Sequence, residues 1–353
     1  MAQHGLKTRR EVALRPALIR IVDRRTELTG TIEFPALPAL ADHISERIVE
    51  MFAGFTQPFS REETGALRAM VVRALDQAYE TSSESRLVVK YSTPPGKGVQ
   101  YEIGVRHLSM EERYEHWASL KEPPLFGKLP DAMVMNMAAS LGKPDEAPIV
   151  DVGAGTGRNA IALARLGHPV TAVEPVTKFA DQLRGAATDD GLPITVIEDD
   201  FLAPEVVLAA GGYRLIVIAE VLTHFRELAE IRGAFAKFAE ALSPGGLVVA
   251  NAFIASPGYR PEPLARQVGE MSWSSFCTPS ELDFITAELP FEKIGDEPVW
   301  DYEQEHLPAE DWPPTGWFEH WCTGRNVFET TPRVPTPIDL RWLVFRRTRT
   351  LSG

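Results

Sequence analysis

Short runs of apolar residues dominate the pattern of the chain from about residue 145 onward, and polar or glycine-rich stretches separate them. Each run has the length of a buried strand. Runs of this kind lie at 149–152, 170–173, 194–197, 215–219, 247–250 and 340–345. A helical segment at about 227–242 follows the fourth run. The pattern predicts a buried sheet whose strands are joined by helices and turns.

Residues 1–110 are patterned differently. Helical periodicity covers 39–55, and Ser60 with Glu63 has the spacing of a capping box at the start of a second helix, at about 61–82. Strand-like alternation follows, in two segments separated by a loop of Pro and Gly. The alternating segments are 86–91 and 99–107.

These elements predict a small α+β accessory domain at 1–110. Residues 111–140 would connect it to a larger domain at 141–353. The accessory domain would serve substrate selection or dimerisation, or would only cover a sheet edge; the sequence leaves these alternatives open.

A glycine-rich turn follows the first buried run. Gly153, Gly155 and Gly157 are spaced G-x-G-x-G, and Asp151 stands two residues ahead of them. The dinucleotide fingerprint is G-x-G-x-x-G, whose third glycine position is held here by Arg158. A carboxylate beside a pyrophosphate is repelled, whereas one beside a cationic group is attracted. The turn therefore favours a nucleotide-like ligand with a positive end, and S-adenosylmethionine fits.

Acidic residues also follow the second and third runs. Glu174 ends the second strand, where a carboxylate can accept hydrogen bonds from both ribose hydroxyls. Asp199, Asp200 and Phe201 follow the third strand, where a carboxylate can bind an adenine amino group and an aromatic ring can cover the base.

Taken together, these motifs resemble the class I S-adenosylmethionine-dependent methyltransferases over about residues 120–347. The residues that carry the resemblance are 150–157, Glu174, the Asp200–Phe201 pair and 242–246. The resemblance implies a Rossmann-like seven-stranded α/β sheet flanked by helices, with S-adenosylmethionine as cofactor. The cofactor-binding residues that it implies are Asp151, Gly153, Ala154, Gly155, Gly157, Glu174, Pro175, Asp199, Asp200, Phe201, Glu220 and the aromatic Tyr114.

Methyl transfer needs alignment of the reactants and, for some acceptors, a general base, but no fixed set of catalytic residues. Glu220 and His224 follow the fourth strand, at the edge of the sheet where ligands of this fold bind. We expect these two residues to carry any catalytic role, with His224 as the candidate base. The alternative is that they only contact the cofactor or cap a helix.

An acidic, tryptophan-rich insertion occupies about 299–337. Between 299 and 329 it holds seven acidic residues and one basic residue, Arg325. Aromatic faces with carboxylates suit a cationic guest, so the acceptor is expected to be a small metabolite, with a weak preference for an amine or another cation. The expected substrate-binding residues are Tyr259, Trp312, Trp317, His320 and Trp321.

Two further functions stay open at this stage. One is a protein or peptide methyltransferase that docks its substrate on the accessory domain. The other is a protein that binds the cofactor without catalysis.

Composition and charge exclude some classes of binding partner for the protein. The chain has 353 residues and a net charge of −13, which argues against a nucleic-acid substrate because phosphate binding needs a basic surface. The two cysteines suit packing rather than a disulfide scaffold, and no metal-ligand spacing stands out. Without an apolar run long enough for a signal or a span, we expect a cytoplasmic protein with no membrane partner. A homodimer is left open.

Overall fold

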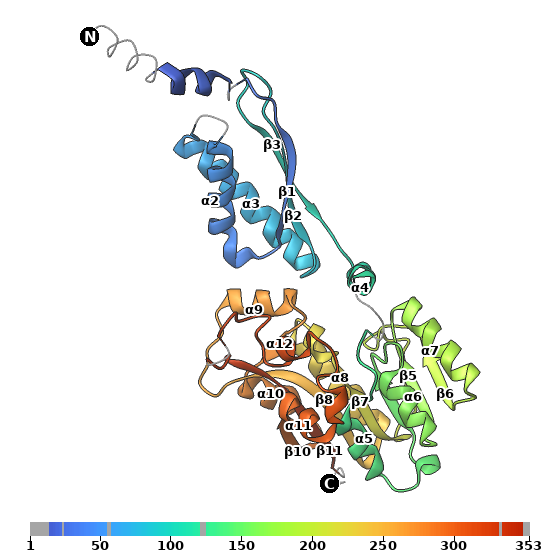
Figure 1. Ribbon diagram of the computed structural model, residues 1–353. Coiled ribbons are helices and arrows are strands. Elements are labelled where there is room, and N and C mark those ends of the chain that lie inside the picture. The colour runs from blue at the N-terminus through green and yellow to red at the C-terminus, as the bar shows by residue number, and fades with distance from the viewer. Residues whose placement is uncertain (1–13, 23–24, 55–57, 121–124, 332–333, 349–353) are drawn as a thin grey trace. The chain divides into compact units, whose positions relative to one another are not determined.

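The computed structural model describes residues 14–22, 25–54, 58–120, 125–331 and 334–348. Its internal contacts divide the chain into two compact units, residues 1–116 and 117–353 (Figure 1).

The first unit is a three-stranded antiparallel sheet with two helices on one face. Its strands are β1 (Thr29–Pro35), β2 (Arg86–Ser92) and β3 (Gln100–Arg106), in the order β1-β2-β3. Its helices are α2 (Ala41–Ala53), α3 (Arg61–Thr81) and the short η1 (Pro38–Leu40), and α4 (Met110–Ser119) crosses into the second unit. A further helix covers residues 14–22.

Alternation along the strands builds the core of this unit. Ile32, Val89 and Ile103 are register partners and pack against α2 and α3, where Phe52 is fully buried. The predicted helices and the Ser60–Glu63 capping box are confirmed. Only two of the three strands were predicted, and β1 completes the sheet. The alternation of polar and apolar residues that ends in Phe34 is the sequence pattern that could have predicted β1.

The second unit is built on one large sheet. The strand order is β10-β11-β8-β7-β4-β5-β6, with the short β9 paired to β8. The central strands are parallel, and β11 runs antiparallel between β8 and β10. The strands are β4 (Ile149–Val152), β5 (Val170–Val173), β6 (Ile194–Ile197), β7 (Tyr213–Ile218), β8 (Leu242–Ala255), β9 (Phe276–Cys277), β10 (Phe291–Pro298) and β11 (Ile338–Arg347).

Helices cover both faces of this sheet. The longer helices are α5 (Ala132–Ala139), α6 (Arg158–Arg165), α7 (Thr177–Asp189), α8 (Leu228–Ala241), α9 (Pro263–Met271), α10 (Pro279–Thr286), α11 (Val299–His306) and α12 (Phe318–Cys322). Short 3-10 turns lie at η2 (Pro144–Glu146), η3 (Leu222–His224) and η4 (Ala309–Asp311). The elements α11, η4 and α12 make up the acidic insertion between β10 and β11.

Strand residues feed two separate hydrophobic cores. Leu215 and Val217 of β7 point into a core that α5, α6 and the insertion share, whereas Ile216 and Ile218 point into a core under α8 and α10. This is why the strands read as continuous apolar runs: a sheet covered on both faces buries both sets of side chains.

The predicted fold class is confirmed, with two differences of detail. The short β9 is added beside the seven predicted strands. Residues 243–246, which precede the predicted strand at 247–250, lie inside the long β8, whose pairing with β7 shifts register there. Among the residues that the structure describes, none of the helices has the length and apolarity needed to cross a bilayer.

Candidate functional site

The site is the glycine turn at the carboxyl end of β4. This strand lies between β5 and β7, where the order of the parallel strands reverses, and ligands of open α/β sheets bind at such a point. Gly153, Gly155 and Gly157 have φ values of +68°, +56° and +95°, a conformation that favours glycine. A Cβ at Gly153 would lie 2.2 Å from Val221 Cγ2, and one at Gly157 would lie 2.5 Å from Leu183 Cδ1.

Asp151 precedes the turn, and one of its carboxylate oxygens is buried without a hydrogen-bond partner in the described part of the chain. The residue is 3% exposed, and its Oδ2 has no hydrogen-bond partner among the described residues. Burial raises the pKa of this carboxyl to about 7, with Asp131 adding to the rise. A buried carboxylate oxygen without a partner is costly, so this atom is suited to receiving a donor or a positive charge from a ligand.

Glu174 ties the turn to the end of β5. Its Oε2 accepts a hydrogen bond from the Gly155 amide at 2.7 Å, and its Oε1 accepts one from the Val176 amide at 2.9 Å. Burial raises the pKa of Glu174, and these two hydrogen bonds oppose the rise. Each oxygen keeps further acceptor capacity, so the predicted contact with ribose hydroxyls is still open to it. The neighbouring Pro175 is exposed, and Ala154 in the turn is buried.

The predicted adenine site divides into two environments. Asp199 and Asp200 are exposed after β6, and each accepts a local backbone hydrogen bond. Phe201 is 4% exposed, and its ring centroid lies 5.4 Å from that of Phe238. The structure thus places the Phe201 ring in the hydrophobic core, whereas the two carboxylates reach the surface.

A buried ion-pair network stands next to the turn. The Arg158 guanidinium lies 2.9 Å from Asp131 and 2.7 Å from Glu220. Asn159 donates to Asp131 at 2.9 Å and accepts from its amide at the same distance. Burial works against the charge of Arg158, but the neighbouring carboxylates raise its pKa. The sequence singled out Arg158, because it stands where the dinucleotide fingerprint has its third glycine, but nothing in the sequence pointed to Asp131.

Glu220 is one of the two candidate catalytic residues. Its φ of +62° is left-handed, which is unusual for a residue with a side chain, and its amide donates to Asn251 Oδ1 at 2.6 Å. Burial raises the pKa of Glu220, and Arg158 opposes the rise. Because its carboxylate pairs with Arg158, Glu220 holds the edge of the site in place.

His224, the other candidate, ends η3 and is partly buried. Burial lowers the pKa of its imidazole to about 4, so the ring is neutral at physiological pH. Its ring centroid lies 5.6 Å from that of Trp273. A neutral imidazole at this position can accept a proton.

A chain of aromatic rings runs from the glycine turn to the insertion. The Phe126 ring lies 3.6 Å from the Cβ position of Gly155, and it stacks on Trp117 with centroids 5.6 Å apart. Trp117 meets Trp273 at 6.1 Å and Trp317 at 6.2 Å, in edge geometry. Trp117 therefore contributes to this packing within the second unit. Tyr114, the aromatic residue expected to contact the cofactor, belongs to the first unit, and its role stays a prediction.

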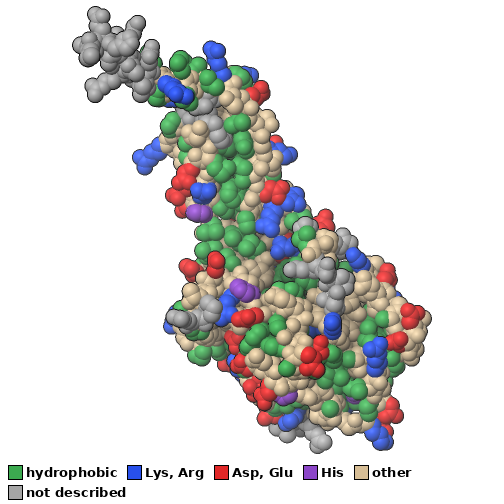
Figure 2. All heavy atoms as spheres, in the orientation of Figure 1, with side chains coloured by type: hydrophobic (Ala, Val, Ile, Leu, Met, Phe, Trp, Pro, Cys, Tyr) green, Lys and Arg blue, Asp and Glu red, His purple; other side chains and the backbone are tan. Residues whose placement is uncertain are grey.

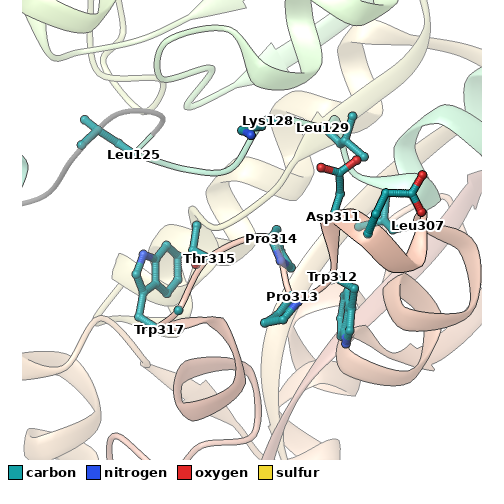
Figure 3. A pocket seen from close by; sticks show the side chains of 12 residues that line it. Leu125, Lys128, Leu129, Leu307, Asp311, Trp312, Pro313, Pro314, Thr315 and Trp317 are labelled. Carbon is teal, nitrogen blue, oxygen red and sulfur yellow. The ribbon is translucent and has the colours of Figure 1, made fainter.

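A pocket of about 520 Å³ opens beside this aromatic chain (Figure 3). Trp312 and Trp317 of the insertion line it together with the segment at 125–129. Lys128, Glu310 and Asp311 supply its charged groups. The Thr315 hydroxyl, also in the lining, is buried without a hydrogen-bond partner among the described residues.

The other predicted substrate residues lie elsewhere. Trp321 packs edge-on against Phe253 and donates its indole N–H to the Trp273 carbonyl at 3.1 Å. Tyr259 packs against Phe328, and His320 is exposed. The structure thus brings Trp312 and Trp317 together in one pocket lining that does not include Tyr259, His320 or Trp321.

Glu303, which sequence reasoning missed, joins the insertion to the site. Its carboxylate accepts hydrogen bonds from the Ala132 and Met133 amides at 2.8 and 3.2 Å, and from Trp342 Nε1 at 2.9 Å. These two amides begin α5, directly after Asp131. Burial raises the pKa of Glu303 to about 7, and Asp131 adds to the rise.

Within the described parts of the chain, no three His, Cys, Asp or Glu side chains are arranged to hold a metal ion.

Comparison with known proteins finds similarity over the part of the chain that contains the glycine turn. Residues 149–246 match the family model described as a methyltransferase domain. An S-adenosyl-L-methionine-dependent Diels-Alderase, iliD, of Neonectria sp. (strain DH2) is 29% identical over 150 residues, which is 40% of this chain and 54% of that protein. A ubiquinone biosynthesis O-methyltransferase of Methylobacterium sp. (strain 4-46) is 32% identical over 146 residues, or 38% of this chain and 55% of that protein. The chain thus spans about half the length of these relatives.

Solved structures show the same general likeness. Geranyl diphosphate methyltransferase in complex with SAM covers 62% of this chain and 85% of its own, with 15% identity and a TM-score of 0.48. The [4+2]-cyclase SpnF covers 62% of this chain and 80% of its own, with 16% identity and a TM-score of 0.44.

The geometry of the turn predicts how Gly157→Ala affects stability. The substitution adds left-handed strain and a clash with Leu183, so we expect it to destabilise the second unit by about 2–4 kcal/mol. Gly185→Ala in α7 is the matched control, because a Cβ there meets nothing within 4 Å; it should be neutral or stabilise by up to about 1 kcal/mol. Thermal unfolding compares the two, and equal melting temperatures would contradict the strain argument.

Asp151 generates a second prediction. Its folded-state pKa of about 7 lies above the ordinary value of about 3.9. The charged form therefore destabilises the fold above about pH 7, and this penalty disappears as the pH falls toward 4. Asp151→Asn should raise the free energy of unfolding at pH 8 by about 1–3 kcal/mol without ligand, and much less at pH 5.

The control for this substitution is Asp283→Asn, at an exposed carboxylate. Chemical denaturation at the two pH values measures both variants. If Asp151→Asn proved destabilising at pH 8, the carboxylate would already be satisfied within the protein.

Proposed function

We propose that this chain, whose residues 149–246 match the methyltransferase-domain family model, transfers a methyl group from S-adenosylmethionine to a small-molecule acceptor. The observation that carries the proposal is the buried Asp151 carboxylate at a left-handed glycine turn. Its unpartnered oxygen suits a ligand with a cationic end, and the amino-acid part of S-adenosylmethionine has one.

The residues around the turn fit this cofactor. Asp151 would bind its ammonium group, Glu174 would accept from its ribose hydroxyls, and Asp199 or Asp200 would contact the adenine. The three glycines let the backbone approach the ligand closely. When bound, the cofactor supplies an electrophilic methyl group on a sulfonium.

The pocket beside Trp312 and Trp317 is the proposed acceptor site. Its volume of about 520 Å³ is that of a typical small-molecule pocket. Indole faces with the carboxylates of Glu310 and Asp311 suit an amine or another cationic acceptor, while Lys128 is placed to hold an anionic group of the same molecule. A hydroxyl acceptor is the next candidate, and one relative is named as an O-methyltransferase.

His224 is the proposed base. A neutral imidazole can take up a proton that the acceptor releases, and the Trp273 ring lies against it. Burial, which lowers its pKa to about 4, makes it a weaker base than free imidazole. Glu220, paired with Arg158, positions the segment that leads to His224.

Two other functions are separated from this one by experiment. A protein or peptide methyltransferase would label a polypeptide rather than a metabolite. One relative is named as an S-adenosyl-L-methionine-dependent Diels-Alderase rather than as a methyltransferase. Sequence similarity therefore does not establish methyl transfer, and the transfer itself must be measured.

Calorimetric titration with S-adenosylmethionine tests the cofactor site. We expect Asp151→Ala to weaken the affinity at least about tenfold, because the loss of a charged contact costs about 1.5–3 kcal/mol. Asp283→Ala, at an exposed position, should leave the affinity unchanged. Full affinity in Asp151→Ala would show that the cofactor binds elsewhere.

Mass spectrometry of a metabolite extract incubated with methyl-labelled cofactor tests the acceptor. We expect a labelled small molecule, and we expect Trp317→Ala to lower its formation about tenfold or more while cofactor affinity changes less than about threefold. Phe284→Ala, an exposed aromatic far from this lining, serves as the control. Label found only in polypeptide would favour the peptide alternative.

The pH profile tests His224. Since its pKa is about 4, its protonation should not limit the rate between pH 6 and 9. With a base role, His224→Gln should lower kcat about 10²-fold at pH 7, the low end for a general base because its pKa is well below 7, and less at a pH where the acceptor has already lost its proton. A uniform loss across the pH range would point to a packing role against Trp273.

A further inference from the structure

The helix at residues 14–22 displays an apolar surface that the fold leaves exposed. Thirteen large apolar side chains are exposed among the described residues, and five of them lie in these nine residues. They are between 50% and 63% exposed: Leu14, Leu18, Ile19, Ile21 and Val22. The helix ends where the Arg25 amide and the Thr26 hydroxyl donate to the Val22 carbonyl, both at 3.0 Å.

Four of the five apolar residues form one face, and Ile19 lies about 60° beyond its edge. At about 100° per residue, Leu14, Leu18, Ile21 and Val22 fall within one arc of about 140°, together with the small Ala17. Arg15 lies about 20° beyond one edge of this arc, between Val22 and Ile19, and Arg20 lies about 60° beyond the other edge. Apolar surface bordered by arginines is the pattern of a helix that lies on an interface, because long basic side chains extend to the polar layer.

The segment 1–25, which contains this helix, has a net charge opposite in sign to that of the rest of the chain. Residues 1–25 hold seven Lys or Arg and two acidic residues, a net charge of +5. The other 328 residues hold 29 Lys or Arg and 47 acidic residues, a net charge of −18. An anionic surface is therefore attracted to this segment and repelled by the remainder, which orients the encounter. Figure 2 shows basic and hydrophobic side chains close together at this end of the first unit.

Two protein occupants fit less well than a lipid surface. A second copy packed helix to helix would bring Arg15 and Arg20 against their own counterparts. The acidic insertion of a second copy has the complementary charge, but its only exposed large apolar side chain within the described residues is Val334. A bilayer with anionic headgroups offers an apolar layer and negative charge together.

We propose that the helix at 14–22 lies on an anionic lipid surface, with its apolar arc in the acyl boundary and its arginines at the headgroups. This is contact with one leaflet, and it revises the expectation of no membrane partner, which considered only spanning segments. It does not depend on the methyltransferase function.

Vesicle sedimentation of the full chain tests the proposal. We expect partitioning onto vesicles with roughly 30 mol % phosphatidylglycerol to exceed that onto pure phosphatidylcholine at least about tenfold, and to fall as NaCl rises from about 50 to 500 mM. Leu18→Glu should lower binding about tenfold or more. Val207→Glu adds the same charge at an apolar position that is 80% exposed in the second unit, and should bind like the parent protein.

Other results would overturn the proposal. One is parent protein that stays in the supernatant with anionic vesicles; another is Leu18→Glu that binds as well as the parent. A dimer in solution that Leu18→Glu converts to a monomer, with no vesicle binding, would assign the face to a second copy. Circular dichroism of Leu18→Glu confirms that the fold is kept, as expected for a change at an exposed position.

Discussion

The buried cation of Arg158 is the interaction on which the site depends. It lies between Asp131 at the start of α5 and Glu220 at the end of β7, and it belongs to the first turn of α6. Removing one member of a buried ion pair leaves an uncompensated charge, which costs more than the pair contributes. The network therefore joins three chain segments around the glycine turn at once, and one of them contains Glu220 in its left-handed conformation.

Much of the second unit could be predicted because its constraints are local. Strands β4, β5 and β6 lie where the apolar runs placed them, and the glycines of the turn are required by backbone angles and by Val221 and Leu183. The residues that escaped prediction act across long sequence separations. Glu303 accepts from α5 across a long stretch of the chain, and Trp342 donates to the same carboxylate. Nothing in the local sequence around Glu303 predicts these contacts.

The insertion illustrates the same division. Its composition drew attention to its tryptophans, but composition does not say which rings face a cavity and which fill a core. Trp312 and Trp317 line the pocket, whereas the indole of Trp321 is committed to Trp273 and Phe253. Phe201 shows the converse, since a position suited to a base-covering ring is used for packing against Phe238. The side on which each ring packs is decided by the three-dimensional neighbours.

The contact between Glu303 and α5 affects whether the insertion can be exchanged as a separate module. Asp131 occupies the N-cap position of α5 without capping it through its own side chain, and the capping acceptor comes from a helix 171 residues further along the chain. The insertion is thus part of the scaffold that holds α5 and Asp131 beside the glycine turn, rather than an appendage laid over it. Grafting a different insertion to alter acceptor choice would succeed only where the graft carries a carboxylate to the same two amides. In the proposed function, acceptor selectivity and the integrity of the core are therefore linked through Glu303.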